Sequence, residues 1–329
     1  MATQIECENL HTIDSLATLE TFEVPSSNFY VIGEGSNTLF VDEQSPELIK
    51  VDIKGIDIVE AQDSFLLTIG AGENWHNIVK YTVENGMPGL ENLALIPGSV
   101  GAAPIQNIGA YGSEFSMFCH SVSWFSFDKK QIITMTGEDC QFGYRESIFK
   151  GALKGQGLVT QVTLCLPKVW QPKLNYSGLD TLPKDCDASQ VMEKVIAIRE
   201  SKLPNPAKLA NCGSFFKNPV VDIKTFEKLI LEYPTMPNYV VSDKAMKLAA
   251  GWLIEQAGLK GYRSGDAGVH EKQALVLVNY GQAKGKEMIA LAQMIIANVK
   301  EKFGIKLSPE VRLVSALGEV DMSSLETYV

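Results

Sequence analysis

The sequence lacks the residues that would mark several classes of protein. Histidine occurs only four times in 329 residues, and no two of the six cysteines form a C-x-x-C pair. Structural zinc sites need closely spaced Cys and His ligands, so we expect no metal site. We expect the six thiols to be free, buried and inert rather than paired in disulfides.

Basic residues are also in the minority. The chain has 29 Lys and Arg against 39 Asp and Glu, a formal net charge of −10. Nucleic-acid binding depends on clustered Lys and Arg, so we expect no nucleic-acid partner. An anionic ligand must instead be held by a few placed cations or by backbone amides.

Long hydrophobic runs are missing as well. No segment approaches ~18 consecutive apolar residues, the length that spans a membrane. The first twenty residues contain acids and no apolar run of signal-peptide length. We therefore expect a cytoplasmic protein without a membrane partner.

The residues that are present indicate an α+β fold. With 45% hydrophobic and 21% charged residues, the chain has globular composition and room for two or three domains. Leu203-Pro204-Asn205-Pro206 ends a helical pattern and is the clearest boundary. Periodicity predicts strands at 29–32, 38–41, 48–53, 65–69, 121–127, 132–136, 158–166, 274–278 and 309–315, and helices at 75–85, 188–201, 223–232, 244–257 and 284–303.

Two glycine-rich segments carry the strongest functional signal. The first, GEGSN at 33–37, is followed by a strand rather than a helix, which disfavours a Rossmann fold. Alone, it fits a tight turn better than a phosphate cradle. The second, GLENLALIPGSVGAAPIQNIGAYG at 89–112, is too interrupted by Gly and Pro for one helix or strand and too apolar for a solvated linker. Together the two segments supply enough backbone donors for a pyrophosphate.

These segments belong to a larger set of motifs. The others are FGYRES at 142–147, KLP at 202–204, GSFFKNP at 213–219, KLAAGWLI at 247–254 and PEVR at 309–312. In this order the motifs resemble the bacterial UDP-N-acetylenolpyruvoylglucosamine reductases over nearly the whole chain. The glycine-rich half is also similar to the wider vanillyl-alcohol-oxidase (PCMH) type of FAD domain.

The resemblance implies a domain organisation and an activity. Residues 1–55, joined by 307–329, would form one FAD-binding subdomain, residues 56–203 the second, and residues 204–306 a separate α/β substrate-binding domain. The implied reaction is the NADPH-dependent, FAD-mediated reduction of UDP-N-acetylglucosamine enolpyruvate to UDP-N-acetylmuramate in peptidoglycan synthesis. We expect a monomer.

The resemblance also implies the cofactor site. The matching loops contain neither His nor Cys, so FAD should be bound without a covalent link. Glu34 places a negative charge beside the expected pyrophosphate, and its side chain should point away from the flavin. The expected cofactor-binding residues are Gly33, Gly35, Ser36, Asn37, Pro97, Gly98, Ser99, Gly101, Gln106, Asn107, Gly109, Ala110 and Tyr111.

Arg145, Ser214 and Glu310 match the catalytic positions of the family. Arg145 would bind a carboxylate with its guanidinium fork, and Glu310, carrying or sharing a proton, would donate to the same oxygens. Ser214 would then protonate C2. Tyr176 lies in a loop that resembles the substrate flap of the family's first structural type. Further substrate contacts are expected from Lys202, Lys217, Asn218, Lys260 and Gln273.

Each catalytic residue also has a simpler interpretation. An Arg after Gly-Tyr is usually a surface ion-pair partner, a Ser after Gly a turn or cap, and a Glu after Pro a solvated acid. Only the ordered set of motifs favours function. Two alternatives stay open at this point: another FAD oxidase or dehydrogenase of the same superfamily, and a nucleotide-sugar sensor without catalytic activity.

Overall fold

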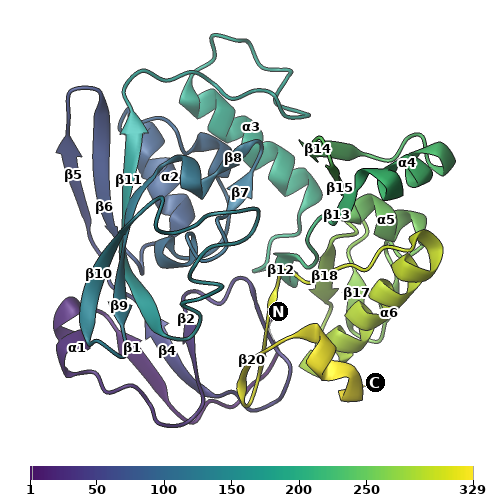
Figure 1. The fold of residues 1–329 in the computed structure, drawn as a ribbon, viewed down its shortest axis with the longest axis horizontal. Helices are drawn as coiled ribbons and strands as arrows, with labels where there is room; N and C mark the ends of the chain where they lie inside the picture. Colours follow the sequence, from purple (N-terminus) through teal and green to yellow (C-terminus); the bar gives the residue numbers. More distant parts are fainter. Residues whose placement is uncertain (2, 329) are drawn as a thin grey trace. The chain divides into compact units, whose positions relative to one another are not determined.

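The computed structural model describes Met1 and residues 3–328, which form two compact units (Figure 1). The N-terminal unit consists of Glu8–Ser36 and Glu47–Ser201, and the C-terminal unit of Met1–Cys7, Asn37–Pro46 and Lys202–Val329. The change of unit after Ser201 lies close to the expected boundary at 203. Residues 37–46, which we expected in an FAD subdomain, belong to the C-terminal unit. The three-part division therefore stays a prediction.

Two sheets form the framework of the N-terminal unit. A parallel sheet of order β1-β4-β2 is followed by a five-stranded antiparallel sheet of order β10-β9-β11-β6-β5. The strands are β1 (Leu10–Ile13), β2 (Phe29–Ile32), β4 (Glu47–Val51), β5 (Ile56–Glu60), β6 (Ser64–Gly70), β9 (Cys119–Ser126), β10 (Gln131–Thr136) and β11 (Gly157–Pro167). The helices are α1 (Leu16–Thr21), α2 (Trp75–Glu84) and α3 (Ala188–Lys202).

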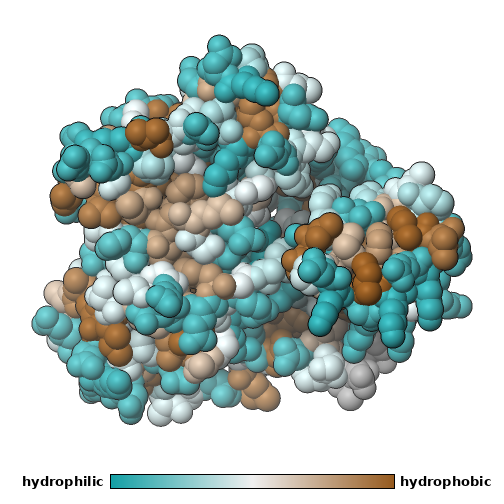
Figure 2. Space-filling model, turned by 45° about the horizontal axis from the view of Figure 1, so that its top comes forward, coloured by the Kyte–Doolittle hydropathy of each residue, from teal (hydrophilic) through white to brown (hydrophobic). Residues whose placement is uncertain are grey.

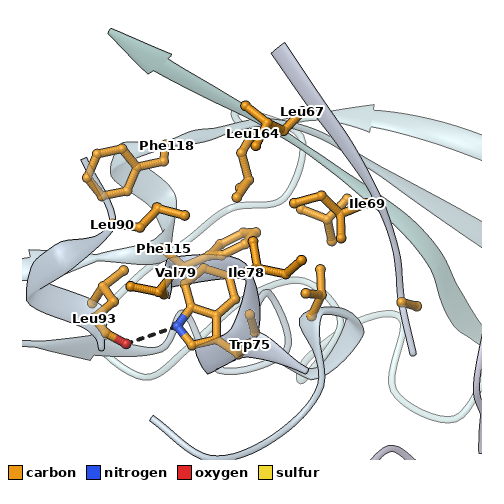
Figure 3. Packing of buried hydrophobic residues seen from close by; sticks show 14 of the residues in the cluster. Leu67, Ile69, Trp75, Ile78, Val79, Leu90, Leu93, Phe115, Phe118 and Leu164 are labelled. Carbon is orange, nitrogen blue, oxygen red and sulfur yellow. Dashed lines mark hydrogen bonds between the residues drawn. The ribbon is translucent and has the colours of Figure 1, made fainter. Parts of the chain in front are cut away.

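The core of this unit forms where α2 meets the larger sheet (Figure 3). Alternate residues of β6 point inward, so that Leu67 and Ile69 are fully buried, and Leu67 pairs with Leu164 of β11. Trp75 begins α2 and is 1% exposed, and its indole Nε1 donates to the Leu93 carbonyl at 3.0 Å. This bond satisfies the one polar atom of the buried indole.

The glycine-rich segment 89–112 is irregular, as predicted. It contains the short 3₁₀ helices η1 (Glu91–Leu93) and η2 (Val100–Ala102) and the two-residue strand β7 (Gly109–Ala110), which pairs with β8 (Ser113–Glu114). A third 3₁₀ turn, η3, spans Phe115–Met117. Three non-glycine residues of the segment, Leu95, Asn107 and Tyr111, have positive φ. Such backbone is held in place by its surroundings.

Three sheets form the C-terminal unit. Their orders are β12-β18-β17-β16, β13-β15-β14 and β20-β19-β3. The strands are β3 (Thr38–Phe40), β12 (Ala210–Ser214), β13 (Val220–Asp222), β14 (Asn238–Ser242), β15 (Ala245–Leu248), β16 (Arg263–Ser264), β17 (Ala267–Val269), β18 (Val276–Asn279), β19 (Arg312–Ser315) and β20 (Gly318–Val320). The helices are α4 (Ile223–Glu232), α5 (Ala250–Gln256), α6 (Gly285–Phe303) and the 3₁₀ helix η4 (Met322–Tyr328). Strand β19 runs parallel to β3, so the end of the chain returns to residues near its start.

One predicted helix is wrong in its first half. We expected a helix over 244–257, but the chain forms strand β15 over Ala245–Leu248 and begins α5 only at Ala250. In this stretch Met246 and Leu248 are buried whereas Ala245 and Lys247 are half-buried, an alternation with the period of a strand. Pairing with β13 and β14 therefore overrides the local helical pattern.

The surface corrects a second expectation. All six cysteines are free, but Cys7 is exposed rather than buried, and Cys119 and Cys165 are partly exposed. The face drawn in Figure 2 is mostly hydrophilic, with hydrophobic residues in scattered groups. Across the described part of the chain, no helix combines the length and hydrophobicity needed to cross a bilayer.

Candidate active site

The two glycine-rich loops lie against each other in the N-terminal unit. The Ser36 hydroxyl donates to the Pro97 carbonyl at 3.1 Å, although 61 residues separate them. A Cβ on Gly33 would come within 2.4 Å of the Ser99 hydroxyl, and a Cβ on Gly98 within 2.8 Å of the Ser36 hydroxyl. The close approach of the two serine hydroxyls, together with the φ of +121° at Gly98, favours glycine at both positions.

A third backbone segment packs against the second loop. Gly101 donates its backbone N–H to the Ala71 carbonyl at 2.8 Å, and a Cβ on Gly101 would lie 2.6 Å from that of Ala71. Gly33, Ser99 and Gly72 line a pocket of about 430 Å³ together with Glu34, Lys50, Val51, Asp52 and Lys54. Glycine backbone, the Ser99 hydroxyl and two lysines are groups that suit the pyrophosphate of FAD.

The side chain of Glu34 is engaged within the same unit. Its Oε1 accepts a hydrogen bond from the side-chain Nδ2 of Asn74 at 2.9 Å. Asn74 also caps α2, because its Oδ1 accepts from the backbone N–H of Asn77 at 3.0 Å. The carboxylate is thus held by the start of a helix rather than left unpaired in the cradle.

Arg145 is held by the second glycine-rich segment. It stands in a tight turn closed by hydrogen bonds between Gly143 and Glu146, and its own φ is +57°. Its Nη2 donates to the Gly109 carbonyl at 2.8 Å, and its Nη1 lies 3.3 Å from the Asn107 carbonyl. The predicted catalytic cation and the predicted flavin loop are therefore in direct contact.

Asn107 fixes this contact through its side chain. It is 1% exposed, its Nδ2 donates to the Gly143 carbonyl at 3.0 Å, and its Oδ1 accepts from Ser116 N–H at 2.9 Å. We predicted a cofactor-binding role from sequence. The hydrogen bonds give the side chain a second role, that of holding the Arg145 turn against the flavin loop.

Tyr111 and Tyr176 also meet in the N-terminal unit. Their ring centroids are 5.1 Å apart in an edge-to-face arrangement, and Tyr176 is 39% exposed. Burial raises the pKa of Tyr111, so its hydroxyl stays protonated at neutral pH. The Tyr111 carbonyl accepts from the Asn92 side chain at 2.8 Å. The expected substrate flap thus rests on the expected flavin loop.

The other two predicted catalytic residues lie together in the C-terminal unit. The Glu310 backbone N–H donates to the Phe215 carbonyl at 2.8 Å, which places Glu310 beside the residue that follows Ser214. Ser214 ends β12 directly after a register shift, and Gly213 has φ +70°. Such bulges redirect side chains next to active sites. Asn37, predicted to bind FAD, donates from Nδ2 to the Glu310 carbonyl at 3.2 Å.

The remaining predicted substrate residues are more dispersed. Lys217 lies on the backbone segment that pairs with residues 308–310, since its N–H donates to the Ser308 carbonyl at 2.9 Å. The Asn218 side chain accepts from Ala250 N–H at 2.9 Å and so caps α5, while the Lys260 ammonium pairs with Glu255 at 2.8 Å. Gln273 accepts from Leu275 N–H, and Lys202 is the exposed last residue of α3.

Sequence reasoning missed the charged group in the pocket. Lys50, Asp52 and Lys54 line it, and the Lys54 ammonium lies 3.1 Å from the Asp52 carboxylate. The sequence signal that could have predicted this group is the alternation of Lys50, Asp52 and Lys54 at the end of β4. In the part of the chain that the structure describes, no three His, Cys, Asp or Glu side chains are grouped as a metal ion would require.

Comparisons with known proteins match both halves of the chain. Residues 14–128 match an FAD binding domain, and residues 205–314 match the family described as UDP-N-acetylenolpyruvoylglucosamine reductase, C-terminal domain. The reductase of Pseudoalteromonas translucida is 46% identical over 324 residues, 98% of this chain and 95% of that protein. That of Pectobacterium atrosepticum is 49% identical over 292 residues, 88% and 85% of the two chains.

A solved structure is similar over the same extent. The crystal structure of UDP-N-acetylenolpyruvylglucosamine reductase from Thermus caldophilus has a TM-score of 0.63 and 25% identity, and covers 93% of this chain and 91% of that one. The matched FAD-binding domain and the named relatives make this chain an FAD-dependent oxidoreductase. The predicted fold class is thereby confirmed, and the chain belongs to the UDP-N-acetylenolpyruvoylglucosamine reductases.

Proposed function

We propose that this chain reduces UDP-N-acetylglucosamine enolpyruvate to UDP-N-acetylmuramate with electrons from NADPH, as a monomer in the cytoplasm. Membership of the reductase family gives the reaction class. The observation that supports the catalytic assignment is the hydrogen bond from Glu310 N–H to the Phe215 carbonyl, which joins the backbone of Glu310 to that of the residue after Ser214. An acid and a hydroxyl on neighbouring backbones suit delivery of a proton to a carbanion.

FAD is the resident cofactor in this proposal. When bound, it supplies the redox chemistry by accepting hydride from NADPH and passing hydride to C3 of the enolpyruvyl group. The glycine loops at 33–37 and 97–101 hold its pyrophosphate through backbone N–H groups and the hydroxyls of Ser36 and Ser99. No His or Cys stands in these loops, so the cofactor is held without a covalent bond.

The substrate carboxylate determines what the charged residues do. Negative charge develops beside this carboxylate when C3 receives hydride, so cations and acids near its oxygens lower the barrier. Arg145 provides a guanidinium whose position is fixed by the Gly109 carbonyl. Glu310 donates a proton or shares one with the same oxygens, and the Ser214 hydroxyl protonates C2.

Binding of the nucleotide diphosphate is the task of the remaining polar residues. Tyr176 closes on it from the flap, while the ammonium groups of Lys202, Lys217 and Lys260 provide positive charge. Lys260 must leave its exposed ion pair with Glu255 to do so, an exchange that costs little because exposed pairs contribute about 0–1 kcal/mol. Asn218 and Gln273 bind the nucleotide diphosphate through their side-chain NH2 groups, because their side-chain oxygens accept from backbone N–H groups.

The test separates the two half-reactions in Ser214→Ala. Reduction of the flavin by NADPH should keep its normal rate, because no proton from Ser214 is needed. Reoxidation by the enolpyruvyl substrate should slow by ~10²–10⁴-fold, the range for a positioned acid. Ser242→Ala, in the exposed strand β14, is the control and should leave both steps unchanged. Equal slowing of both steps would show that Ser214 organises the pocket instead, and hydrogen peroxide production without substrate turnover would indicate an oxidase.

A further inference from the structure

A long loop leads from strand β11 to helix α3 in the N-terminal unit. Residues 168–187 form neither helix nor strand, and they carry Tyr176, which is 39% exposed. Loops longer than about 12–15 residues without secondary structure are uncommon in compact domains and are usually functional. The contacts that fix this loop therefore decide where its tyrosine lies.

Glu91 holds the loop at Trp170. Glu91 begins the 3₁₀ helix η1 and is 1% exposed. Its carboxylate accepts from the Trp170 indole Nε1 at 2.9 Å and from Gly89 N–H at 2.7 Å. A buried carboxylate needs such donors, because the cost of removing it from water is recovered only through hydrogen bonds or a cation. Hydrogen bonds to a carboxylate are also stronger than those between neutral groups, so this anchor is a firm one.

Asn92 holds the loop at a second point. It is fully buried, and its Nδ2 donates to the carbonyls of Lys173 at 3.0 Å and of Tyr111 at 2.8 Å. Its Oδ1 is buried and has no hydrogen-bond partner among the described residues. Turning the amide over would set this oxygen against two carbonyl oxygens, so the unsatisfied acceptor stays. The contribution of the side chain is therefore its two donors, which join the loop to the glycine-rich segment.

Both anchors stand on a rigid support. The next residue of η1 is Leu93, whose carbonyl accepts from the Trp75 indole at the start of α2 (Figure 3). Leu93 and Trp75 are themselves buried in the core of the unit. The anchors therefore transmit the position of the core to the loop.

Tyr176 lies in a short arm between two fixed points of the loop. One is Lys173, held by Asn92, and the other is Leu179, which is fully buried. Between them the chain makes a tight turn, in which Tyr176 N–H donates to the Leu174 carbonyl and the Tyr176 carbonyl accepts from Leu179 N–H. Only residues 174–178 separate the two points, so the anchors limit where the tyrosine can move.

We propose that Glu91 and Asn92 are positioning residues for the substrate, acting through Tyr176. They fix the start of the loop against the glycine-rich segment, so that the Tyr176 ring rests on Tyr111 before the nucleotide binds. This inference rests on the proposed contact between Tyr176 and the nucleotide diphosphate. A side chain that is ordered in advance binds more tightly, because the cost of ordering it is not taken from the binding free energy.

Trp170→Phe tests the anchor at Glu91 in the FAD-saturated protein. Phe keeps a ring at this partly buried position and removes the indole N–H donor. The dissociation constant of the oxidised protein for UDP-N-acetylglucosamine enolpyruvate, measured by isothermal titration, should rise about two- to ten-fold, the range expected when one more side chain is ordered on binding. Reoxidation of the reduced flavin at saturating enolpyruvyl nucleotide should keep its rate, because only binding is weakened. Asn92→Ala removes the second anchor and should act in the same direction, but Trp170→Phe, which is the milder change, decides the test.

A double variant gives the readout that separates positioning from a general loss of stability. If the anchor acts through the Tyr176 hydroxyl, the losses are not additive, and Trp170→Phe/Tyr176→Phe should bind no more weakly than Tyr176→Phe alone. Thr82→Val is the control. Thr82 is fully buried in α2 and its hydroxyl donates to the Val79 carbonyl at 2.9 Å, so the variant loses one buried hydrogen bond in the same unit but outside the loop. Its thermal unfolding midpoint should fall while its affinity for the enolpyruvyl nucleotide stays unchanged.

Three results would contradict the proposal. Wild-type affinity in Trp170→Phe, with weaker binding in Tyr176→Phe, would show that the anchor does not place the tyrosine. Additive losses in the double variant would show that Trp170 affects binding by another route. Wild-type affinity in Tyr176→Phe itself would remove the tyrosine from the substrate site, so that the proposed contact fails first and this inference fails with it.

Discussion

At the scale of single residues, hydrogen bonds from distant parts of the chain hold the candidate catalytic residues. Arg145, Ser214 and Glu310 stood in recognisable motifs, and the structure places Arg145 on the Gly109 carbonyl and Glu310 beside Phe215. The supporting bond from Asn107 to the Gly143 carbonyl links positions 36 apart. Such a partner is decided by tertiary packing, which no local pattern encodes.

Asn107→Asp tests that support. The substitution keeps an acceptor for Ser116 N–H but replaces the amide donor that faces the Gly143 carbonyl and Glu114 with an oxygen. We expect kcat to fall because the Arg145 turn loosens, and the free energy of unfolding to drop by about 1–3 kcal/mol, the cost of an unsatisfied buried group. Steady-state kinetics and urea unfolding measure the two effects. The control is Asn298→Asp in α6, which loses the hydrogen bond from its side-chain Nδ2 to the Met294 carbonyl. An equal loss of activity in both variants would contradict the positioning role.

Tyr176→Phe tests the flap. The ring should keep its contact with Tyr111, because that contact uses the aromatic edge and not the hydroxyl. The loss should appear in binding of the enolpyruvyl nucleotide, at about 1.5–3 kcal/mol for one hydrogen bond to a charged group. Isothermal titration gives the dissociation constant, with the exposed Tyr262→Phe as control. An unchanged dissociation constant for Tyr176→Phe would remove the tyrosine from the substrate site.

At the scale of elements, the reliable predictions were those with long, uninterrupted periods. Helix α6 was expected over 284–303 and forms over Gly285–Phe303, where Gly304 with φ +71° ends it. The segment at 244–257 failed because four residues of β15 suffice for a strand once β13 and β14 pair with it. A shared role of the loops at 33–37 and 97–101 was expected from their backbone donors, but no local pattern encodes their contact, since their residues are far apart in sequence.

Gly101→Ala tests how closely these elements must approach. The added Cβ would meet the Cβ of Ala71 at 2.6 Å and its carbonyl oxygen at 3.1 Å, and backbone cannot yield as a side chain does. We expect about 1–3 kcal/mol lower stability, as for overpacking elsewhere, and weaker FAD binding. Fluorescence titration of the flavin and urea unfolding report these changes. In Gly151→Ala the nearest atom is 3.6 Å away, so this control should bind FAD normally; normal FAD binding by Gly101→Ala would show that the loop adjusts freely.

At the scale of the whole molecule, the two units divide the site residues between them. The N-terminal unit holds most of the expected flavin residues together with Arg145 and Tyr176, while the C-terminal unit holds Ser214 and Glu310. Each unit has its own hydrophobic core. The C-terminal unit is nevertheless assembled from three segments of chain, so a sequence boundary at 203 describes only part of the division.

This division predicts that FAD stabilises the two units unequally. Trp252 packs on Tyr233 and Phe303 in the C-terminal unit, whereas the other three tryptophans, Trp75, Trp124 and Trp170, lie in the N-terminal unit. A ligand at 100 times its dissociation constant stabilises the folded form that binds it by about 2.7 kcal/mol. In urea, the fluorescence of Trp252→Phe reports unfolding of the N-terminal unit. The difference between the wild type and this variant reports Trp252 and so the C-terminal unit. FAD should therefore shift the first transition to higher urea concentration by more than it shifts the second. Equal shifts would mean that the units unfold as one, and a shift confined to Trp252 would place FAD on the C-terminal unit instead.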